Sequence, residues 1–179
     1  HAWCLMTNHV HLLVTPECDT GISNFMKVVC SRYAQYINKN YLRTGTLWEG
    51  RHKASAVESR TYLLKCYRYI ELNPVAAMMV SQPAEYRWSS YGANAWGEND
   101  QLITPHEDYL ELSSNRLTRQ ASYRELFNSR LTDEDVKTFR KAAHYSMPVG
   151  SPQFHAQLEA RLGRPLGQAS RGRPRRQTG

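Results

Sequence analysis

Apolar and polar residues alternate at the start of the chain, which is the pattern of a strand with one buried face. Residues 2–15 divide into two such runs at Thr7 and Asn8, a pair that suits a tight turn. We therefore expect a β-hairpin. The apolar side chains of its second strand are expected to point into the core: Val10, Leu12 and Val14.

The next regular pattern has the spacing of a helix. Apolar side chains line one face between Ile22 and Ile37: Phe25, Met26, Val29, Tyr33 and Tyr36. This spacing predicts an amphipathic helix. Ser23 and Asp19 are the candidates for its N-cap, because their short side chains can accept a hydrogen bond from a free backbone N–H.

A stretch rich in turn-forming residues leads into a second helix. Residues 44–59 begin in turn chemistry and pass into a short strand predicted around His52 to Val57. A helix is then expected from Ser59, as its cap, to about Leu72. Pro74 sets the end of that helix, because proline cannot continue it.

The second half of the chain predicts a loop, several helices and a basic tail. Residues 81–105 are rich in turn formers and aromatics, so we expect irregular structure pinned to the core by Tyr86, Trp88 and Tyr91. Helical spacing returns in 106–145 and in 152–162. The patterns divide the chain into a first domain over 1–92, a mainly helical extension over 93–162 and an arginine-rich disordered tail over 163–179.

Composition favours a polyanionic partner. The 179 residues are 41% hydrophobic, which is enough for one core, and the formal net charge is +7. The cysteines stand singly, with no CxxC pair, and predict reduced thiols rather than a zinc knuckle or a disulfide framework: Cys4, Cys18, Cys30 and Cys66. No apolar run approaches the roughly 20 residues that span a bilayer, so we expect no membrane partner and a cytoplasmic location.

Two histidines in the predicted hairpin are candidate metal ligands. His9 and His11 are two residues apart, so on a strand both imidazoles project from one face. Such a pair can bind one divalent cation and leave positions open for a phosphate oxygen, which the cation polarises. The same spacing also describes two half-exposed strand histidines without a ligand.

The second predicted helix carries a possible nucleophile. Tyr69 and Asn73 are four residues apart and share one helical face. A phenol, with an ordinary pKa near 10, attacks a phosphodiester usefully only when a metal or a base helps to remove its proton. The amide oxygen of Asn73 is a suitable third ligand for a hard cation. Taken alone, the tyrosines of this helix are better explained as aromatic packing.

Three blocks in this order resemble the signature blocks of REP-associated tyrosine transposases, a single-tyrosine HUH family: MTNHVHLLV, LWEGRHKAS and YLLKCYRYIELNPV. WSSY at 88–91 resembles a further block, so the resemblance covers roughly residues 2–92. It implies an α+β fold in which a ferredoxin-like antiparallel sheet carries packed helices. Because the chain opens on His1 in what looks like the middle of such a sheet, we expect its first strand and helix to be missing.

The resemblance also implies a reaction. Tyr69 would attack a phosphate of single-stranded or hairpin-bearing DNA, cleaving and rejoining it through a 5′-phosphotyrosine during DNA transposition. Mg²⁺ or Mn²⁺ would be held by His9, His11 and Asn73. No nucleotide cofactor is implied, because the phosphotyrosine conserves the energy of the broken bond. Monomer and homodimer both stay open.

Basic residues near these motifs are candidate DNA contacts. Five of them lie close in sequence to the proposed site and suit a backbone-binding track, or a solvated basic face: Arg51, Lys53, Arg60, Lys65 and Arg68. Four more lie in the tail, where glycine and proline favour an extended arm that binds phosphates: Arg171, Arg173, Arg175 and Arg176.

Two other functions fit the same residues. A domesticated protein that binds hairpin DNA without cleaving it would keep the basic track and tolerate loss of Tyr69. A metal-dependent nuclease with water as its nucleophile would use the histidine pair without a covalent intermediate. The carboxylate cluster usual for such a hard-metal site is not evident near the histidines.

Overall fold

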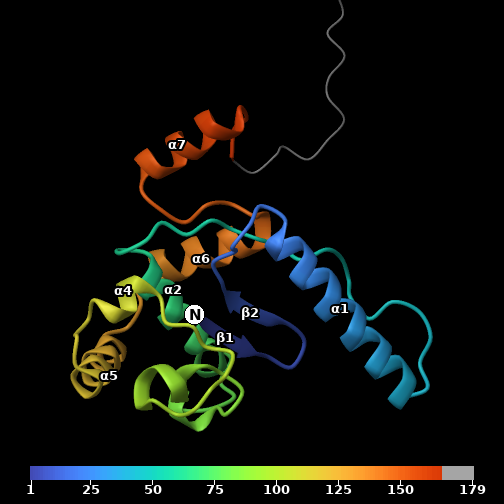
Figure 1. The fold of residues 1–179 in the computed structure, drawn as a ribbon, viewed down its shortest axis with the longest axis horizontal. Helices are drawn as coiled ribbons and strands as arrows, with labels where there is room; N and C mark the ends of the chain where they lie inside the picture. The colour runs from blue at the N-terminus through green and yellow to red at the C-terminus, as the bar shows by residue number, and fades with distance from the viewer. Residues whose placement is uncertain (167–179) are drawn as a thin grey trace, which may run out of the picture.

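The computed structural model describes residues 1–166 and contains the predicted hairpin. Strands β1 (Ala2–Leu5) and β2 (Val10–Leu13) pair antiparallel, and Leu5 lies opposite Val10 next to the turn. The Met6 N–H donates to the His9 carbonyl at 2.9 Å and closes the turn. Together with the helices packed on this sheet, the hairpin confirms the α+β class (Figure 1).

The core-facing side of β2 is the opposite of the one expected. Val10 and Val14 are 40% and 42% exposed, and Leu12 is only half-buried, whereas Leu13 is buried and His11 is half-buried. The reason is that helix α2 packs on the face that carries His11 and Leu13. Because side chains alternate along a strand, the valines then point to the outer face of the sheet.

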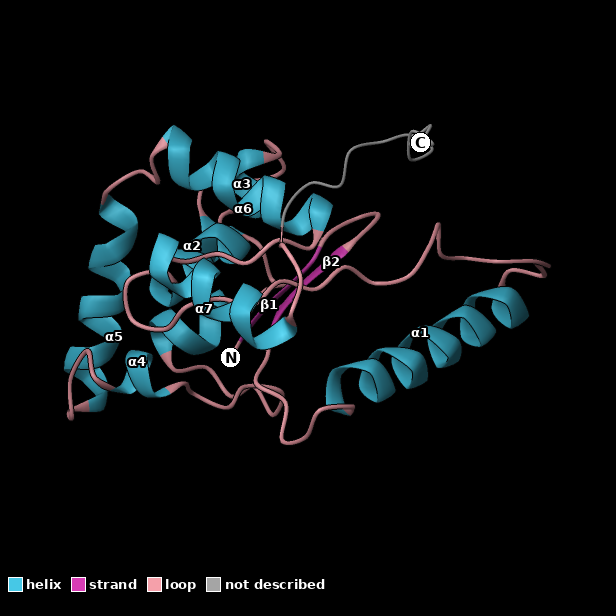
Figure 2. Ribbon diagram, turned by 90° about the horizontal axis from the view of Figure 1, so that it is seen from above, coloured by secondary structure: helices cyan, strands magenta, loops and turns pink. Residues whose placement is uncertain are grey.

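Helix α1 (Gly21–Asn40) is confirmed but stands apart from the core. Figures 1 and 2 both show it extending away from the sheet and from the other helices. Its N-cap is Thr20, not Ser23 or Asp19, and no side chain caps it, because Thr20 itself has helical backbone angles. Several side chains of its predicted apolar face are exposed: Phe25, Val29, Tyr33 and Tyr36.

The strand predicted around His52 to Val57 is not formed. Val57 makes one isolated parallel bridge with Val149, supported by 2.8 Å hydrogen bonds from Glu58 N–H to the Val149 carbonyl and from Val149 N–H to the Ala56 carbonyl. The prediction is wrong because a strand needs a neighbouring strand along its length, and this segment meets only helix α6, through Ser55 Oγ and the Ala142 carbonyl, and the loop that follows it.

Helix α2 (Leu63–Glu71) carries the candidate nucleophile. It begins three residues later than expected, with Tyr62 rather than Ser59 at its N-cap, and no side chain caps it. It ends at Leu72 as predicted, but the chain turns directly into a short helix, α3 (Asn73–Ala76). Pro74 lies in the first turn of α3, where backbone N–H groups have no partner within the helix, so the N–H that proline lacks costs no hydrogen bond.

The remaining elements are mostly helices, as the spacing of 106–145 and 152–162 predicts. The 81–105 segment holds two short turns of helix, η1 (Pro83–Glu85) and η2 (Gly92–Trp96). After it come α4 (Glu107–Leu110), α5 (Arg116–Glu125), η3 (Leu126–Asn128), α6 (Asp133–Tyr145) and α7 (Pro152–Leu162). Side-chain caps start the three longer helices α5, α6 and α7, from Asn115, Thr132 and Ser151.

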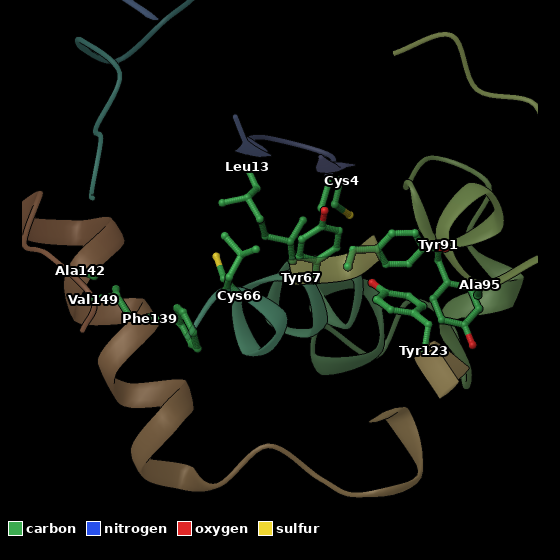
Figure 3. Close-up of a cluster of buried hydrophobic side chains, with 14 residues drawn as sticks. Cys4, Leu13, Cys66, Tyr67, Tyr91, Ala95, Tyr123, Phe139, Ala142 and Val149 are labelled. Atoms are coloured by element: carbon green, nitrogen blue, oxygen red, sulfur yellow. The ribbon is translucent and has the colours of Figure 1, made fainter. Parts of the chain in front are cut away.

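The core surrounds α2 and is rich in tyrosine. Figure 3 shows side chains of the hairpin, of α2, of the segment around Tyr91 and of α5 meeting in one cluster. Tyr67 and Tyr123 are fully buried, with ring centroids 6.0 Å apart. The four cysteines are free thiols, as predicted. No helix within residues 1–166 is long and apolar enough to cross a membrane.

Glu71 is a carboxylate in the middle of this core. It accepts hydrogen bonds from Ser90 Oγ at 2.6 Å, Asn94 Nδ2 at 2.8 Å and Tyr123 Oη at 2.7 Å. Burial raises the pKa of Glu71 to about 7, although these three donors act to lower it. The network ties the C-terminal end of α2 to the 88–96 segment and to α5.

Candidate active site

The hairpin brings the two predicted histidines together. His9 Nε2 and His11 Nε2 are 3.1 Å apart, and the ring centroids are 4.8 Å apart. His9 Nδ1 donates to Asn8 Oδ1 at 2.7 Å, so in the neutral imidazole His9 Nε2 carries the lone pair. The two ring nitrogens therefore converge on one point at the end of the sheet.

This spacing fits two ligands of a single divalent cation. Such cations bind imidazole nitrogen or oxygen ligands at about 2.0–2.1 Å, so ligands at neighbouring corners of an octahedron lie about 3 Å apart. Burial lowers the pKa of His11 to about 4, with the adjacent His9 acting in the same direction and a hydrogen bond with Asn73 opposing both. His11 is thus neutral at pH 7, the form that binds metal.

Tyr69 lies beside the histidine pair. Its ring stands edge-on to that of His11, with centroids 5.8 Å apart, and stacks on the Phe139 ring of α6 at 5.0 Å. The side chain is half-buried. The two aromatic contacts hold the phenol in a fixed orientation at the boundary between the core and the surface.

The surroundings of Tyr69 act on its ionisation in opposite directions. Burial raises the pKa of the Tyr69 hydroxyl, whereas the positive charge of Arg140 and hydrogen bonds with Arg140 and Asn73 lower it. Burial has the larger effect, so the phenol is protonated at neutral pH. Nucleophilic use of this oxygen requires help in removing the proton.

Asn73 connects the histidines to the tyrosine. Its Nδ2 donates to the backbone carbonyl of Tyr69 at 2.7 Å, which fixes the carboxamide across the junction of α2 and α3. Its side chain also contributes to the pKa values of His11 and Tyr69. Within residues 1–166 no three His, Cys, Asp or Glu side chains are grouped as a metal site, so a cation here would depend on an amide oxygen beside the histidine pair.

The five basic candidates near the site separate into two groups. Arg51, Lys53 and Arg60 are exposed, on the segment that precedes α2. Lys65 forms an ion pair with Asp135 at 2.8 Å. Arg68 is only 8% exposed and donates to the carbonyl of Ser129. The prediction that it belongs to a DNA-binding track is therefore corrected: its side chain makes an internal structural contact.

The internal contacts of Lys65 and Arg68 have one physical cause. α6 and the chain before it pack against α2, and they supply Asp135 and Ser129 from more than 60 residues further along the chain. Nothing local distinguishes Lys65 or Arg68 from the exposed basic residues. The four tail arginines, Arg171, Arg173, Arg175 and Arg176, lie outside the described residues.

Three residues of the site were not predicted from the sequence. Asn8 orients His9, Phe139 supports the Tyr69 ring, and Arg140 places a positive charge beside the phenol. Asn8 is adjacent to the histidine motif, and an amide next to a metal-binding histidine was a usable signal. Phe139 and Arg140 belong to a helix whose docking on α2 leaves no mark in the local pattern.

Comparison with known proteins supports a link to transposases. No curated protein and no solved structure gives a significant match to the chain. Residues 1–73, which include His9, His11, Tyr69 and Asn73, match the family model of IS200-like transposases. This part of the chain, which carries the whole histidine–tyrosine–asparagine site, is therefore similar to the IS200-like transposases.

Proposed function

We propose that the protein cleaves and rejoins single-stranded DNA through a covalent 5′-phosphotyrosine at Tyr69, as a transposase of the REP-associated kind. The observation that carries the proposal is the convergence of His9 Nε2 and His11 Nε2 at 3.1 Å with the Tyr69 ring beside them. The family match and the net charge of +7 support DNA as the substrate. The blocks LWEGRHKAS and WSSY support the REP-associated branch.

In the proposed reaction the Tyr69 oxygen forms a bond to phosphorus and the bond from phosphorus to the 3′ oxygen breaks. The phenolic proton is lost, and the departing 3′ oxygen takes up a proton to become a hydroxyl. Arg140 favours the ionised phenol, and stacking on Phe139 holds the ring in place. The reverse step rejoins the strand, since the phosphotyrosine keeps the energy of the ester bond.

Mg²⁺ or Mn²⁺ would be held by His9, His11 and the amide oxygen of Asn73. When bound, the cation supplies Lewis-acid stabilisation of charge on the phosphate oxygens. Asn8 fixes the orientation of the His9 ring through the 2.7 Å hydrogen bond, and the neutral state of His11 keeps its lone pair available. Replacing either histidine by alanine is expected to remove metal-dependent cleavage.

A nicking assay tests the assignment of the nucleophile. Wild type, Tyr69→Phe and the control Tyr62→Phe are incubated with labelled hairpin-bearing single-stranded DNA and Mn²⁺, and binding is measured in parallel by fluorescence anisotropy. Tyr69→Phe is expected to bind DNA as wild type does and to lose nicking, because only the attacking oxygen is removed. Tyr62→Phe, the same change two helical turns earlier at the N-cap of α2, is expected to nick normally.

Each other result selects a different function. Nicking by Tyr69→Phe at the wild-type rate would remove Tyr69 as the nucleophile and favour a nuclease that uses water. Binding without nicking by the wild-type protein would favour the hairpin-binding alternative.

A further inference from the structure

The geometry points to a nucleobase pocket beside the active site that prefers guanine. A cavity of about 310 Å³ lies between η1 and η2, lined by Tyr86, Arg87, Trp96 and Glu98 among others. This is the lower end of the range for small-molecule sites, and it suits a single base. The inference rests on the proposed function, because it assigns part of the same single strand to this cavity.

Trp96 provides the stacking surface. Its indole is 54% exposed, and the Arg124 guanidinium lies over the ring with Cζ 4.0 Å from the centroid. Arg124 also donates to the Ala95 carbonyl. This hydrogen bond fixes the guanidinium, and the guanidinium in turn fixes the plane of the Trp96 ring. Arg124 is not among the cavity-lining residues in the described chain, so the cavity meets another part of the indole. A base stacks there without displacing the arginine.

Two side chains of opposite charge supply hydrogen bonds to the base. The Glu98 carboxylate lies directly over Gly92, where a Cβ would come within 2.2 Å of Oε2, so glycine is what allows the carboxylate to occupy this place. Neither ion pair found in residues 1–166 involves Glu98. Arg87 stacks over the Trp88 ring, with Cζ 4.5 Å from the centroid, which leaves the N–H groups in the guanidinium plane free to donate.

Guanine is the base that satisfies both groups. An arginine pairs in bidentate fashion with its O6 and N7 acceptors, while a carboxylate accepts from its N1–H and N2–H groups. Adenine and cytosine offer the carboxylate only an amino group, and thymine offers only N3–H. Glu98 and Arg87 therefore favour guanine, because each of the two side chains can form two hydrogen bonds with it.

The cavity lies close enough to the histidine pair to act on the same strand. Leu5 N–H donates to the Trp88 carbonyl at 2.9 Å, and Tyr86 Oη donates to the Leu5 carbonyl at 2.6 Å. The 86–89 segment thus runs along β1, on the side away from β2 (Figure 1). Two strand spacings, about 10 Å, separate it from the strand of His11. Because Cys4, opposite His11 on β1, is buried, a single strand bound at the histidines would reach the cavity around the turn end of the hairpin, where His9 and Leu5 lie.

The test measures binding of the full chain to short labelled oligodeoxythymidine strands in the presence of EDTA, with and without one central guanine. Wild type is expected to bind the guanine strand about tenfold more tightly. Glu98→Gln is expected to lower that preference severalfold, since only the Arg87 contacts to guanine remain, without changing affinity for the thymidine strand. Glu111→Gln, the same change at the exposed C-cap of α4, is the control and is expected to keep the preference.

A second variant tests the stacking surface. Trp96→Ala is expected to weaken binding of both strands about tenfold, and Trp96→Phe to keep most of the affinity. Equal binding of the two strands by wild type, an unchanged preference in Glu98→Gln, or full affinity in Trp96→Ala would each overturn the pocket. A wild-type protein that nicks DNA yet shows no guanine preference would sink the pocket alone. Failure to bind either strand would remove the proposed function with it.

Discussion

The buried carboxylate of Glu71 makes the stability of the fold depend on pH in a direction that the structure determines. Its pKa rises from the ordinary 4.5 to about 7 in the folded protein. A difference of roughly 2.5 pKa units corresponds to about 3 kcal/mol, at about 1.4 kcal/mol per unit. The folded state holds this proton more tightly than the unfolded state does. The stabilising contribution is therefore complete below pH 4.5 and is lost as the pH rises through about 7.

Urea unfolding at a series of pH values checks this magnitude. Between pH 4.5 and 7.5 the free energy of unfolding of wild type should fall relative to that of Glu71→Gln by about 3 kcal/mol. The difference between the two proteins removes the contributions of His11 and other groups that titrate in both. The control Glu111→Gln, at an exposed site, should keep the wild-type slope. A Glu71→Gln variant with the wild-type pH profile would refute the account of the Glu71 network.

Two further predictions concern single contacts, and a third concerns the basic tail. Asn8→Ala should lower Mn²⁺ affinity by about 10–100-fold in calorimetric titrations, because His9 loses its orienting partner; unchanged affinity would exclude that role. Arg68→Ala should cost about 1–3 kcal/mol in urea unfolding, and the exposed control Arg51→Ala under about 0.5 kcal/mol; equal losses would contradict the structural role of Arg68. Truncation after Leu162 should flatten the salt dependence of DNA binding, and an unaltered slope would exclude the tail from phosphate contacts.

Local patterns were sufficient to predict most elements and to predict that the two histidines lie together. Turn chemistry at Thr7 and Asn8 gave the hairpin, and helical spacing gave α1, α6 and α7. The spacing of His9 and His11 correctly predicted that the two imidazoles lie together, although His9 lies just before β2 and only His11 is in the strand. These features depend on residues close in sequence, for which alternation and helical period are direct signals.

Features set by distant contacts could not be predicted in this way. Alternation shows that one face of β2 is buried but not which one. Helix α2 packs on the face that carries His11 and Leu13, so that face is the buried one. Lys65 and Arg68 resemble DNA-binding residues in the sequence, and only the packing of α6 against α2 shows their internal partners. The 52–57 segment has the composition of a strand but lacks a neighbouring strand to pair with.

The measurement that tests the central claim most directly is peptide mass spectrometry of the protein after reaction with hairpin-bearing single-stranded DNA and Mn²⁺. A protein–DNA adduct that resists denaturation is expected, with a 5′-phosphonucleotide attached to the peptide containing Tyr69. Strand cleavage without an adduct, or an adduct on a tyrosine other than Tyr69, would contradict it.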